Sequence, residues 1–436
     1  PIVFIDGSNI LAESGEPRGL MIYAANCTVK GLGFTRSPWV GIAMLLPDAT
    51  GNTVRDCWCG VDPNGTSAAA NTKQGIQISD GAHANTIGPG NVLSGNSEYG
   101  IWISGSATVE NTITGNLIGT NAQGNAALPN NFGGVIVTGA SHGNTIGGGN
   151  TISGNNNAGV WLTGTGVFGN TVSGNRIGTT PAGTAAIPNS SSGIYLVSGA
   201  SQNLVSGNVI SGNGDGFGYG ILIADPGTDD NVISSNLIGL RPDGGALGNA
   251  FAGIGISNGS KDSIIYQNRI AHNASLGISM YDAPTTGHTI RENSISNHGF
   301  AGIAIGPANH TQTQPSLSSA VSDTGGLTLS GSLNSAPSSA FRIEFFANDA
   351  PGWGGGATFL GALENLTTDA GGAASFITTL PAAVASGRVI TATATAVSTG
   401  DSSGFSAPFT VSAVDSDNDG MPDDFENANG LDDSVN

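Results

Sequence analysis

Acidic residues near the C-terminus have the spacing of a calcium-binding loop. Asp415, Asp417 and Asp419 alternate with other residues, Gly420 follows them, and the segment fits the pattern D-x-D-x-D-G-x5-E. Carboxylate and carbonyl oxygens are the ligands that Ca2+ prefers, and the glycine permits the sharp turn. The alternative is an acidic tail without a metal. We predict Ca2+ as a cofactor with these ligands: Asp415, Asp417, Asp419, the carbonyl of Met421, Asp423 and Glu426.

A row of aromatic residues forms a second candidate site. The pattern of Gly, aliphatic, any residue, aliphatic recurs ten times, and its third position holds Trp102, Trp161 and Tyr195 in nearby copies. Flat rings in a line suit stacking on sugar rings, so these residues predict contact with a glycan or a partner. Because Ile136 and Leu222 share the row, an apolar stripe covered by loops or by another chain is the alternative.

Four residues in the later repeats are the candidates for catalysis. Asp225 and Asp282 occupy equivalent positions two repeats apart, and two carboxylates roughly 10 Å apart are marginal for inverting glycoside hydrolysis. Arg269 and Arg291 offer the cation that a β-elimination lyase needs beside its base. The sequence does not bring an Arg and a base onto one strand face, so turn aspartates and solvated arginines are the alternative.

The spacing of the repeats predicts the element that positions these residues. The copies begin at residues 41, 75, 100, 134, 159, 193, 220, 253, 277 and 302. Between copies lie two further short segments, such as 111–114 and 116–119, with aliphatic residues at a period of two, which indicates strands. Three short strands per repeat, stacked in parallel, make a right-handed parallel β-helix of about ten coils.

Asparagines and insertions mark the corners of the predicted coils. An Asn opens many of the segments, and we expect it to adopt the left-handed corner conformation and to hydrogen-bond from coil to coil. The clearest column is Asn116, Asn175, Asn208, Asn236, Asn268 and Asn293. Longer repeats carry an insertion that begins at residue 60, 119, 178 or 239. We expect these insertions to fold back as loops and to build a ridge along one edge.

The repeats N-x-I-G-T-x-x-x-G-x-A-A-L-P-N and N-T-I-S-G-N resemble those of bacterial secreted or cell-surface proteins in the pectin-lyase-like β-helix superfamily. The resemblance covers residues 1–310 and implies the right-handed β-helix and an extracellular location. It leaves the activity open, because the superfamily includes lyases, hydrolases, epimerases and adhesins. The W-I-D-H and R-I-K motifs of pectate lyases and polygalacturonases are absent from this sequence.

Alternating strand patterns after residue 310 predict a β-sandwich over 311–413. It resembles the Ig-like modules that follow such solenoids, and it could serve as a spacer, a carbohydrate-binding module or a cap on the last coil. Residues 414–436 form the predicted calcium tail, which resembles EF-hand-like and thrombospondin-type-3-like calcium repeats. The expected domains are therefore 1–310, 311–413 and 414–436.

The charge and hydropathy of the chain limit the classes of partner that it can bind and the functions that it can have. The net charge is −19, which disfavours binding to nucleic acid and to anionic lipid, and no segment is apolar and long enough for membrane insertion. The remaining partners are extracellular polysaccharide or other copies of the chain. We predict an extracellular structural or adhesive cell-surface protein, self-assembling or in contact with a glycan. The alternative is a calcium-dependent polysaccharide lyase or glycoside hydrolase, and the absent catalytic motifs disfavour it.

Overall fold

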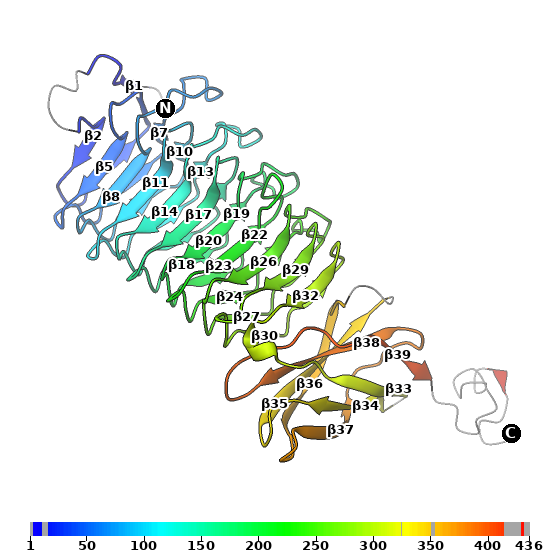
Figure 1. Ribbon diagram of the computed structural model, residues 1–436. Helices are drawn as coiled ribbons and strands as arrows, with labels where there is room; N and C mark the ends of the chain where they lie inside the picture. Colours follow the sequence, from blue (N-terminus) through cyan, green and yellow to red (C-terminus); the bar gives the residue numbers. More distant parts are fainter. Residues whose placement is uncertain (1–2, 11–15, 324, 350–353, 414–428, 431–436) are drawn as a thin grey trace.

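The computed structural model describes residues 3–10, 16–323, 325–349, 354–413 and 429–430. A long solenoid of parallel strands is followed by a smaller unit of two sheets (Figure 1). The predicted all-β fold with a right-handed parallel β-helix is confirmed. Within the described ranges, no helix is both long and apolar enough to cross a membrane.

The solenoid consists of three parallel sheets, here called A, B and C, and each coil contributes one strand to each sheet. Sheet A contains β1 (Val3–Asp6), β4 (Leu32–Thr35), β7 (Trp58–Cys59), β10 (Val92–Leu93), β13 (Leu117–Ile118), β16 (Thr151–Ile152), β19 (Arg176–Ile177), β22 (Val209–Ile210), β25 (Leu237–Ile238), β28 (Arg269–Ala271) and β31 (Ser294–Ser296). Sheet B contains β2 (Leu20–Ile22), β5 (Ile42–Leu45), β8 (Ile76–Ser79), β11 (Tyr99–Ser104), β14 (Gly133–Thr138), β17 (Ala158–Thr163), β20 (Ile194–Val197), β23 (Ile221–Ala224), β26 (Ala252–Ser257), β29 (Leu276–Met280) and β32 (Ala301–Ile305). Sheet C contains β3 (Thr28–Lys30), β6 (Thr53–Arg55), β9 (Thr86–Ile87), β12 (Thr112–Thr114), β15 (Thr145–Gly147), β18 (Thr171–Ser173), β21 (Leu204–Ser206), β24 (Val232–Ser234), β27 (Ile264–Tyr266) and β30 (Thr289–Arg291).

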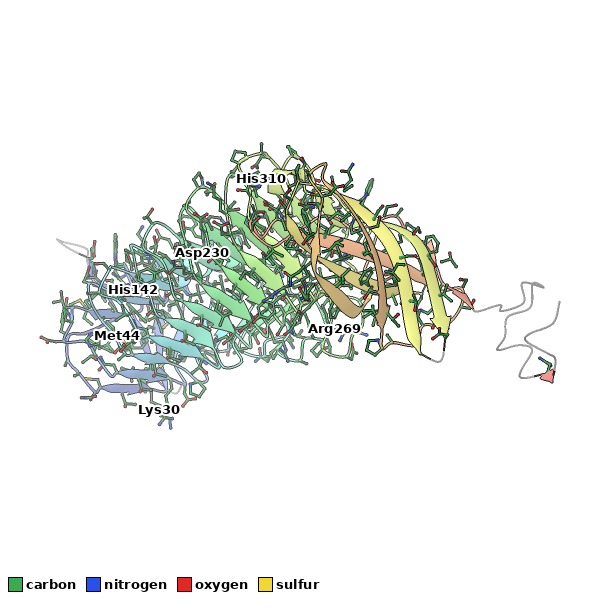
Figure 2. All side chains as sticks on the ribbon, turned by 90° about the horizontal axis from the view of Figure 1, so that it is seen from below. Lys30, Met44, His142, Asp230, Arg269 and His310 are labelled. Carbon is green, nitrogen blue, oxygen red and sulfur yellow. The ribbon has the colours of Figure 1, made fainter. Side chains whose placement is uncertain are left out.

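Alternation along each short strand builds the core. In β12, Ile113 is fully buried between the half-buried Thr112 and Thr114. The register places Ile113 beside Ile146 of the next coil, so the inward side chains stack in columns and form a continuous apolar cluster along the solenoid. Figure 2 contrasts the two kinds of position, with Met44 within the solenoid and Lys30 on its outside. Burial of these columns is the main source of the fold's stability.

Asparagine side chains connect the coils, as predicted. Asn116 donates from Nδ2 to Oδ1 of Asn150 (3.0 Å), and Asn150 donates in turn to Asn175 (2.9 Å). Oδ1 of Asn150 also accepts the backbone N–H of Asn116, which lies in the preceding coil. The predicted column therefore also contains Asn91 and Asn150. Two further ladders comprise Asn52, Asn85, Asn111, Asn144, Asn170, Asn203 and Asn231, and Asn71, Asn96, Asn130, Asn155, Asn189, Asn213, Asn249 and Asn273.

The backbone corrects one expectation about these asparagines. The left-handed residue at the corner is the one before the ladder Asn, as in Gly115 (φ 63°), Gly174 (φ 67°) and Gln267 (φ 54°). The side-chain amide of each ladder Asn points into the column of asparagines, and the chain makes its sharp bend at the residue before that Asn. The conformational requirement therefore falls on the preceding residue, which is often glycine.

Histidine takes over from asparagine at the end of the sheet C ladder. Nδ1 of His288 accepts the N–H of Ser263 (3.3 Å), and Nε2 donates to the carbonyl of Ser260 (2.9 Å). Asn231, in the coil before that of Ser263, makes the same two kinds of bond: its Oδ1 accepts a backbone N–H, and its Nδ2 donates to a backbone carbonyl. The two ring nitrogens of His288 therefore take the roles of Oδ1 and Nδ2. Asn309, in the short 3-10 helix η1 (Asn309–Thr311), continues the column by accepting the N–H of His288.

The insertions form the predicted ridge. Each is a small hairpin closed by an antiparallel bridge, for example Thr120 with Ala127. The hairpins contact one another along the solenoid, because the N–H of Ala122 donates to the carbonyl of Gly65 (2.9 Å). A Cβ at Gly65 would lie 3.0 Å from the Trp58 ring, so the ridge lies directly over the outward side chains of sheet A.

Two four-stranded sheets follow the solenoid and pack on a shared apolar core. One sheet contains β33 (Ser316–Asp323), β34 (Gly326–Asn334), β37 (Ala373–Leu380) and β40 (Ser412–Ala413). The other contains β35 (Ala340–Asn348), β36 (Thr358–Thr367), β38 (Val389–Ala396) and β39 (Phe409–Thr410). The arrangement is a β-sandwich, as the strand spacing predicts, and its resemblance to an Ig-like module stays a prediction.

The sandwich covers the end of the solenoid. Ile295 of β31 exchanges backbone hydrogen bonds of 2.8 and 2.7 Å with Gly356, and the N–H of Ile290 in β30 donates to Oγ of Ser402. Phe405 and Phe346 of the sandwich belong to the solenoid's own apolar cluster. Of the three roles considered, these contacts identify a cap, since they occupy strand edges that would otherwise be open to pairing.

Candidate functional site

Sheet B carries the aromatic row predicted from the repeats. The register pairs Trp102 with Ile136, Ile136 with Trp161, and Trp161 with Tyr195. These residues therefore stand on consecutive coils, at a strand spacing of about 4.8 Å. The outward column of sheet B reads Met21, Ala43, Gln77, Trp102, Ile136, Trp161, Tyr195, Leu222, Gly255, Ser279 and Ala304.

The rings in this column are half-buried and packed on one another. Trp161 and Tyr195 meet edge to face with ring centroids 5.7 Å apart, and Ile136 between Trp102 and Trp161 is buried. The Tyr195 hydroxyl is hydrogen-bonded to Ser191. The indole N–H of Trp161 has no hydrogen-bond partner among the described residues. The outward column of sheet B therefore presents aromatic rings that pack against neighbouring side chains, together with the indole N–H of Trp161 as a donor without a partner among the described residues.

A second row of aromatic residues, which sequence reasoning missed, lies where the sheet B strands begin. Tyr99 packs against Phe132 (5.8 Å between centroids), and Tyr219 packs against Phe251 (5.3 Å). Tyr219 also covers Gly255 of the outward column, where a Cβ would come within 2.4 Å of its ring. An aromatic residue directly before the glycine of the repeat, as at Tyr99 and Tyr219, was the available signal.

The three faces of the solenoid differ in what they expose. The ridge covers part of the outer surface of sheet A. Sheet C presents a row of aligned threonines, which are Thr28, Thr53, Thr86, Thr112, Thr145 and Thr171. Sheet B combines partly exposed aromatic rings with polar side chains over many coils, a composition that suits a binding surface.

A depression of about 350 Å³ opens at the N-terminal end of sheet B. Trp39, Tyr99 and Trp102 line it together with Gln77 and Lys73. Nζ of Lys73 lies 5.0 Å from the centroid of the Trp39 ring. Trp39 packs against the small buried apolar cluster of Val40, Ala43 and Leu45.

The two candidate aspartates lie in turns that follow sheet B strands. Asp225 (φ 80°) accepts the N–H of Ser198 (3.1 Å), and Asp282 (φ 71°) accepts the N–H of Asn258 (2.8 Å). The amide of Asn258 also donates to Asp225, at 3.2 Å. Each carboxylate therefore satisfies a backbone donor of the preceding coil, which is the work of a turn aspartate.

The candidate arginines lie on other faces. Arg269 begins β28 in sheet A, and Arg291 ends β30 in sheet C with its guanidinium 5.5 Å from the Tyr266 ring centroid. Neither belongs to the sheet B turns that hold Asp225 and Asp282. The four residues are therefore not brought together as an acid, base and cation of one site.

The predicted calcium ligands, Asp415 to Glu426, lie outside the described residues. Within the described ranges, no group of three or more His, Cys, Asp and Glu side chains is arranged to hold a metal ion. Two buried histidines in the described ranges have lowered pKa values. Burial lowers the pKa of His288 and of His298 to about 4. Both lie in the last coils, away from the aromatic rows of sheet B.

Comparison with known protein families matches part of the solenoid. Residues 119–315 match the family described as a right handed beta helix region. A double mutant of the periplasmic alginate epimerase AlgG is 13% identical, with 69% of this chain and 84% of that chain covered and a TM-score of 0.41. The catalytic domain of a GH87 alpha-1,3-glucanase in complex with nigerose is 15% identical, with 69% and 61% covered and a TM-score of 0.34.

A more distant similarity is to the tailspike protein gp49 from Acinetobacter baumannii bacteriophage Fri1, a capsular polysaccharide depolymerase. It is 10% identical, with 81% of this chain and 73% of that chain covered and a TM-score of 0.26. Among curated proteins, none matches the sequence.

Proposed function

We propose that this protein is an extracellular glycan-binding solenoid that holds a polysaccharide along sheet B without cleaving it. The observation that carries the proposal is the aligned outward column with Trp102, Trp161 and Tyr195 on nearby coils. Aromatic faces present apolar area at a low entropic cost, because each ring has few rotatable bonds. A repeating polymer suits a repeating surface, since each coil offers a similar contact.

The strand-start row supports the same surface. Tyr99 with Phe132 and Tyr219 with Phe251 extend the aromatic area sideways and along the solenoid. The cap favours a surface contact over assembly by coil stacking, because Gly356 and Ser402 occupy strand edges of the last coil. Assembly with other copies stays an alternative, but not through the capped edges of the last coil.

Catalysis is the second candidate, and the arrangement of Asp225, Asp282, Arg269 and Arg291 on separate elements disfavours it. We expect no release of unsaturated products from pectin, alginate or polygalacturonate. Products that disappear in the Arg269→Ala or Arg291→Ala variant would establish the lyase instead. Ca2+ binding by the loop from Asp415 to Glu426 is proposed on its ligand spacing.

The test is binding of immobilised polysaccharides by the parent and by the double variant Trp161→Ala, Tyr195→Ala. We expect the double variant to lose at least about tenfold in affinity, since each removed ring contributes about 1 kcal/mol or more. Phe168→Ala is the matched control, because Phe168 is an exposed aromatic that stacks on His142 away from sheet B. Equal binding by parent and double variant, or no binding by the parent, would contradict the proposal.

A further inference from the structure

We infer that the depression at the N-terminal end of sheet B is the anchoring subsite for a neutral, hydroxyl-rich sugar unit. The inference rests on the proposed function and specifies which sugar chemistry it serves. Trp39, Tyr99 and Trp102 supply aromatic side chains around a space of about 350 Å³. That volume falls within the range of small-molecule sites.

The orientation of Gln77 is determined by its neighbours. Its Nε2 donates to Oγ of Ser79 (3.0 Å), and the Ser79 hydroxyl donates to Oδ2 of Asp80 (3.0 Å). Because an ionised carboxylate only accepts hydrogen bonds, the Ser79 proton is committed to Asp80 and its oxygen must accept from Gln77. The amide oxygen of Gln77 therefore remains as an acceptor, and it has no partner among the described residues. The side chain is only 6% exposed.

Gln74 presents a second acceptor in the same wall. Its Nε2 donates to the Glu98 carboxylate at 3.3 Å, and the reverse amide orientation would set two oxygens against each other. Its Oε1 also lacks a partner within the described ranges, and the side chain is 6% exposed. Buried acceptors without a donor are costly, so a ligand that brings hydroxyl donors relieves them.

Charge pairing excludes an acidic sugar. Lys73, the cation among the lining residues, is ion-paired with Glu98 and also lies over the Trp39 ring. Glu16 in the rim is ion-paired with Arg18 at 2.5 Å. A uronate carboxylate would meet two carboxylates and two unpaired carbonyl oxygens, with no cation left to bind it. The lining therefore selects a neutral unit by repulsion as well as by hydrogen bonding.

The experiment measures binding of neutral and acidic hexasaccharides by calorimetry. The probes are cellohexaose, laminarihexaose and mannohexaose, with hexagalacturonate and hexamannuronate as their acidic counterparts. We expect the parent to bind within the neutral set and to reject both uronates. Gln77→Met should weaken binding of the neutral ligand about fivefold, because one hydrogen bond contributes roughly 1 kcal/mol. Trp39→Ala should weaken it at least as much.

Controls keep the subsite separate from the surface as a whole. Gln123→Met changes an exposed glutamine on the ridge and should bind as the parent does. Unchanged thermal unfolding of the Gln77 variant shows that the loss is local. If Trp161→Ala abolishes binding while Gln77→Met and Trp39→Ala bind normally, the subsite is wrong and the glycan-binding surface stands. Preference for a uronate overturns the neutral subsite, and no binding of any probe overturns both proposals.

Discussion

Replacing His288 by Asn should remove an acid-sensitive step from the last coils. His288 stands where earlier coils carry a ladder asparagine, and its neutral ring accepts from Ser263 and donates to Ser260. A proton on Nδ1 would set that nitrogen against the N–H of Ser263. Asparagine supplies the same acceptor and donor, as Asn203 and Asn231 do in preceding coils, and it does not titrate.

The magnitude follows from the shift in titration. Burial lowers the pKa of His288 to about 4, below the value of 6.5 that describes the unfolded chain. As the pH falls, the unfolded chain therefore takes up this proton first. The contribution to stability is complete above pH 6.5 and is lost progressively toward pH 4. A pKa difference of this size removes about 2 kcal/mol of unfolding free energy at pH 5 and approaches 3 kcal/mol below pH 4.

The assay is urea unfolding of the parent and of His288→Asn at pH 7.5 and pH 5. We expect the parent to lose about 2 kcal/mol more than the variant between the two pH values. His298, whose pKa is also lowered to about 4, affects both proteins equally and cancels in the difference. His142→Asn is the control, because His142 stacks on Phe168 outside the ladders. An equal loss in parent and His288→Asn would refute the reasoning.

Three further predictions concern the ladder, the cap and the tail. Asn150→Ala should lower the unfolding free energy by about 3 kcal/mol, because the side-chain amide of Asn116 and the carbonyls of Ile113 and Gly147 lose their hydrogen-bond partner. A change below about 1 kcal/mol in denaturant unfolding would contradict this. Phe405→Ala should lower the unfolding free energy by about 3–5 kcal/mol, because Phe405 packs edge-on against Phe346 with ring centroids 5.3 Å apart. The same variant should expose the link between solenoid and sandwich to proteolysis. An unchanged digestion pattern would show that the cap does not depend on Phe405. Asp417→Ala with Asp419→Ala should abolish Ca2+ uptake in calorimetry, and equal uptake by this variant would reject the loop as the site.

The aromatic column shows how much of the site was predictable. A strict repeat places its third position on the same side of every coil, so Trp102, Trp161 and Tyr195 could be aligned before the structure was known. The strand-start row was missed because its members do not recur at one position. Tyr99 directly precedes the repeat glycine, whereas Phe251 stands two residues before it. Their meeting depends on how the chain enters each strand.

The catalytic candidates show the opposite case. Equivalent positions in the repeat correctly placed Asp225 and Asp282 in matching turns, but the sequence did not reveal their partners. Ser198 and Asn258 of the preceding coils occupy those carboxylates with backbone N–H groups. A hydrogen bond between residues about 25 positions apart depends on the stacking of two turns, which no local pattern encodes.

The sequence alone determined the stacked coils and their inward columns, because strand alternation and a repeated spacing act over a few residues and then recur. It predicted about ten coils, whereas sheets A and B each contain eleven strands, since the coil of β2 lies before the first of the ten copies. Only the tertiary structure decided which surfaces stay open. The ridge lies over sheet A and the sandwich closes the last coil, because contacts such as Ala122 with Gly65 and Ile295 with Gly356 join distant segments. The depression of Trp39, Gln77 and Trp102 arises in the same way. These three residues come from three different coils, and the register of the stacked strands gathers them into one site.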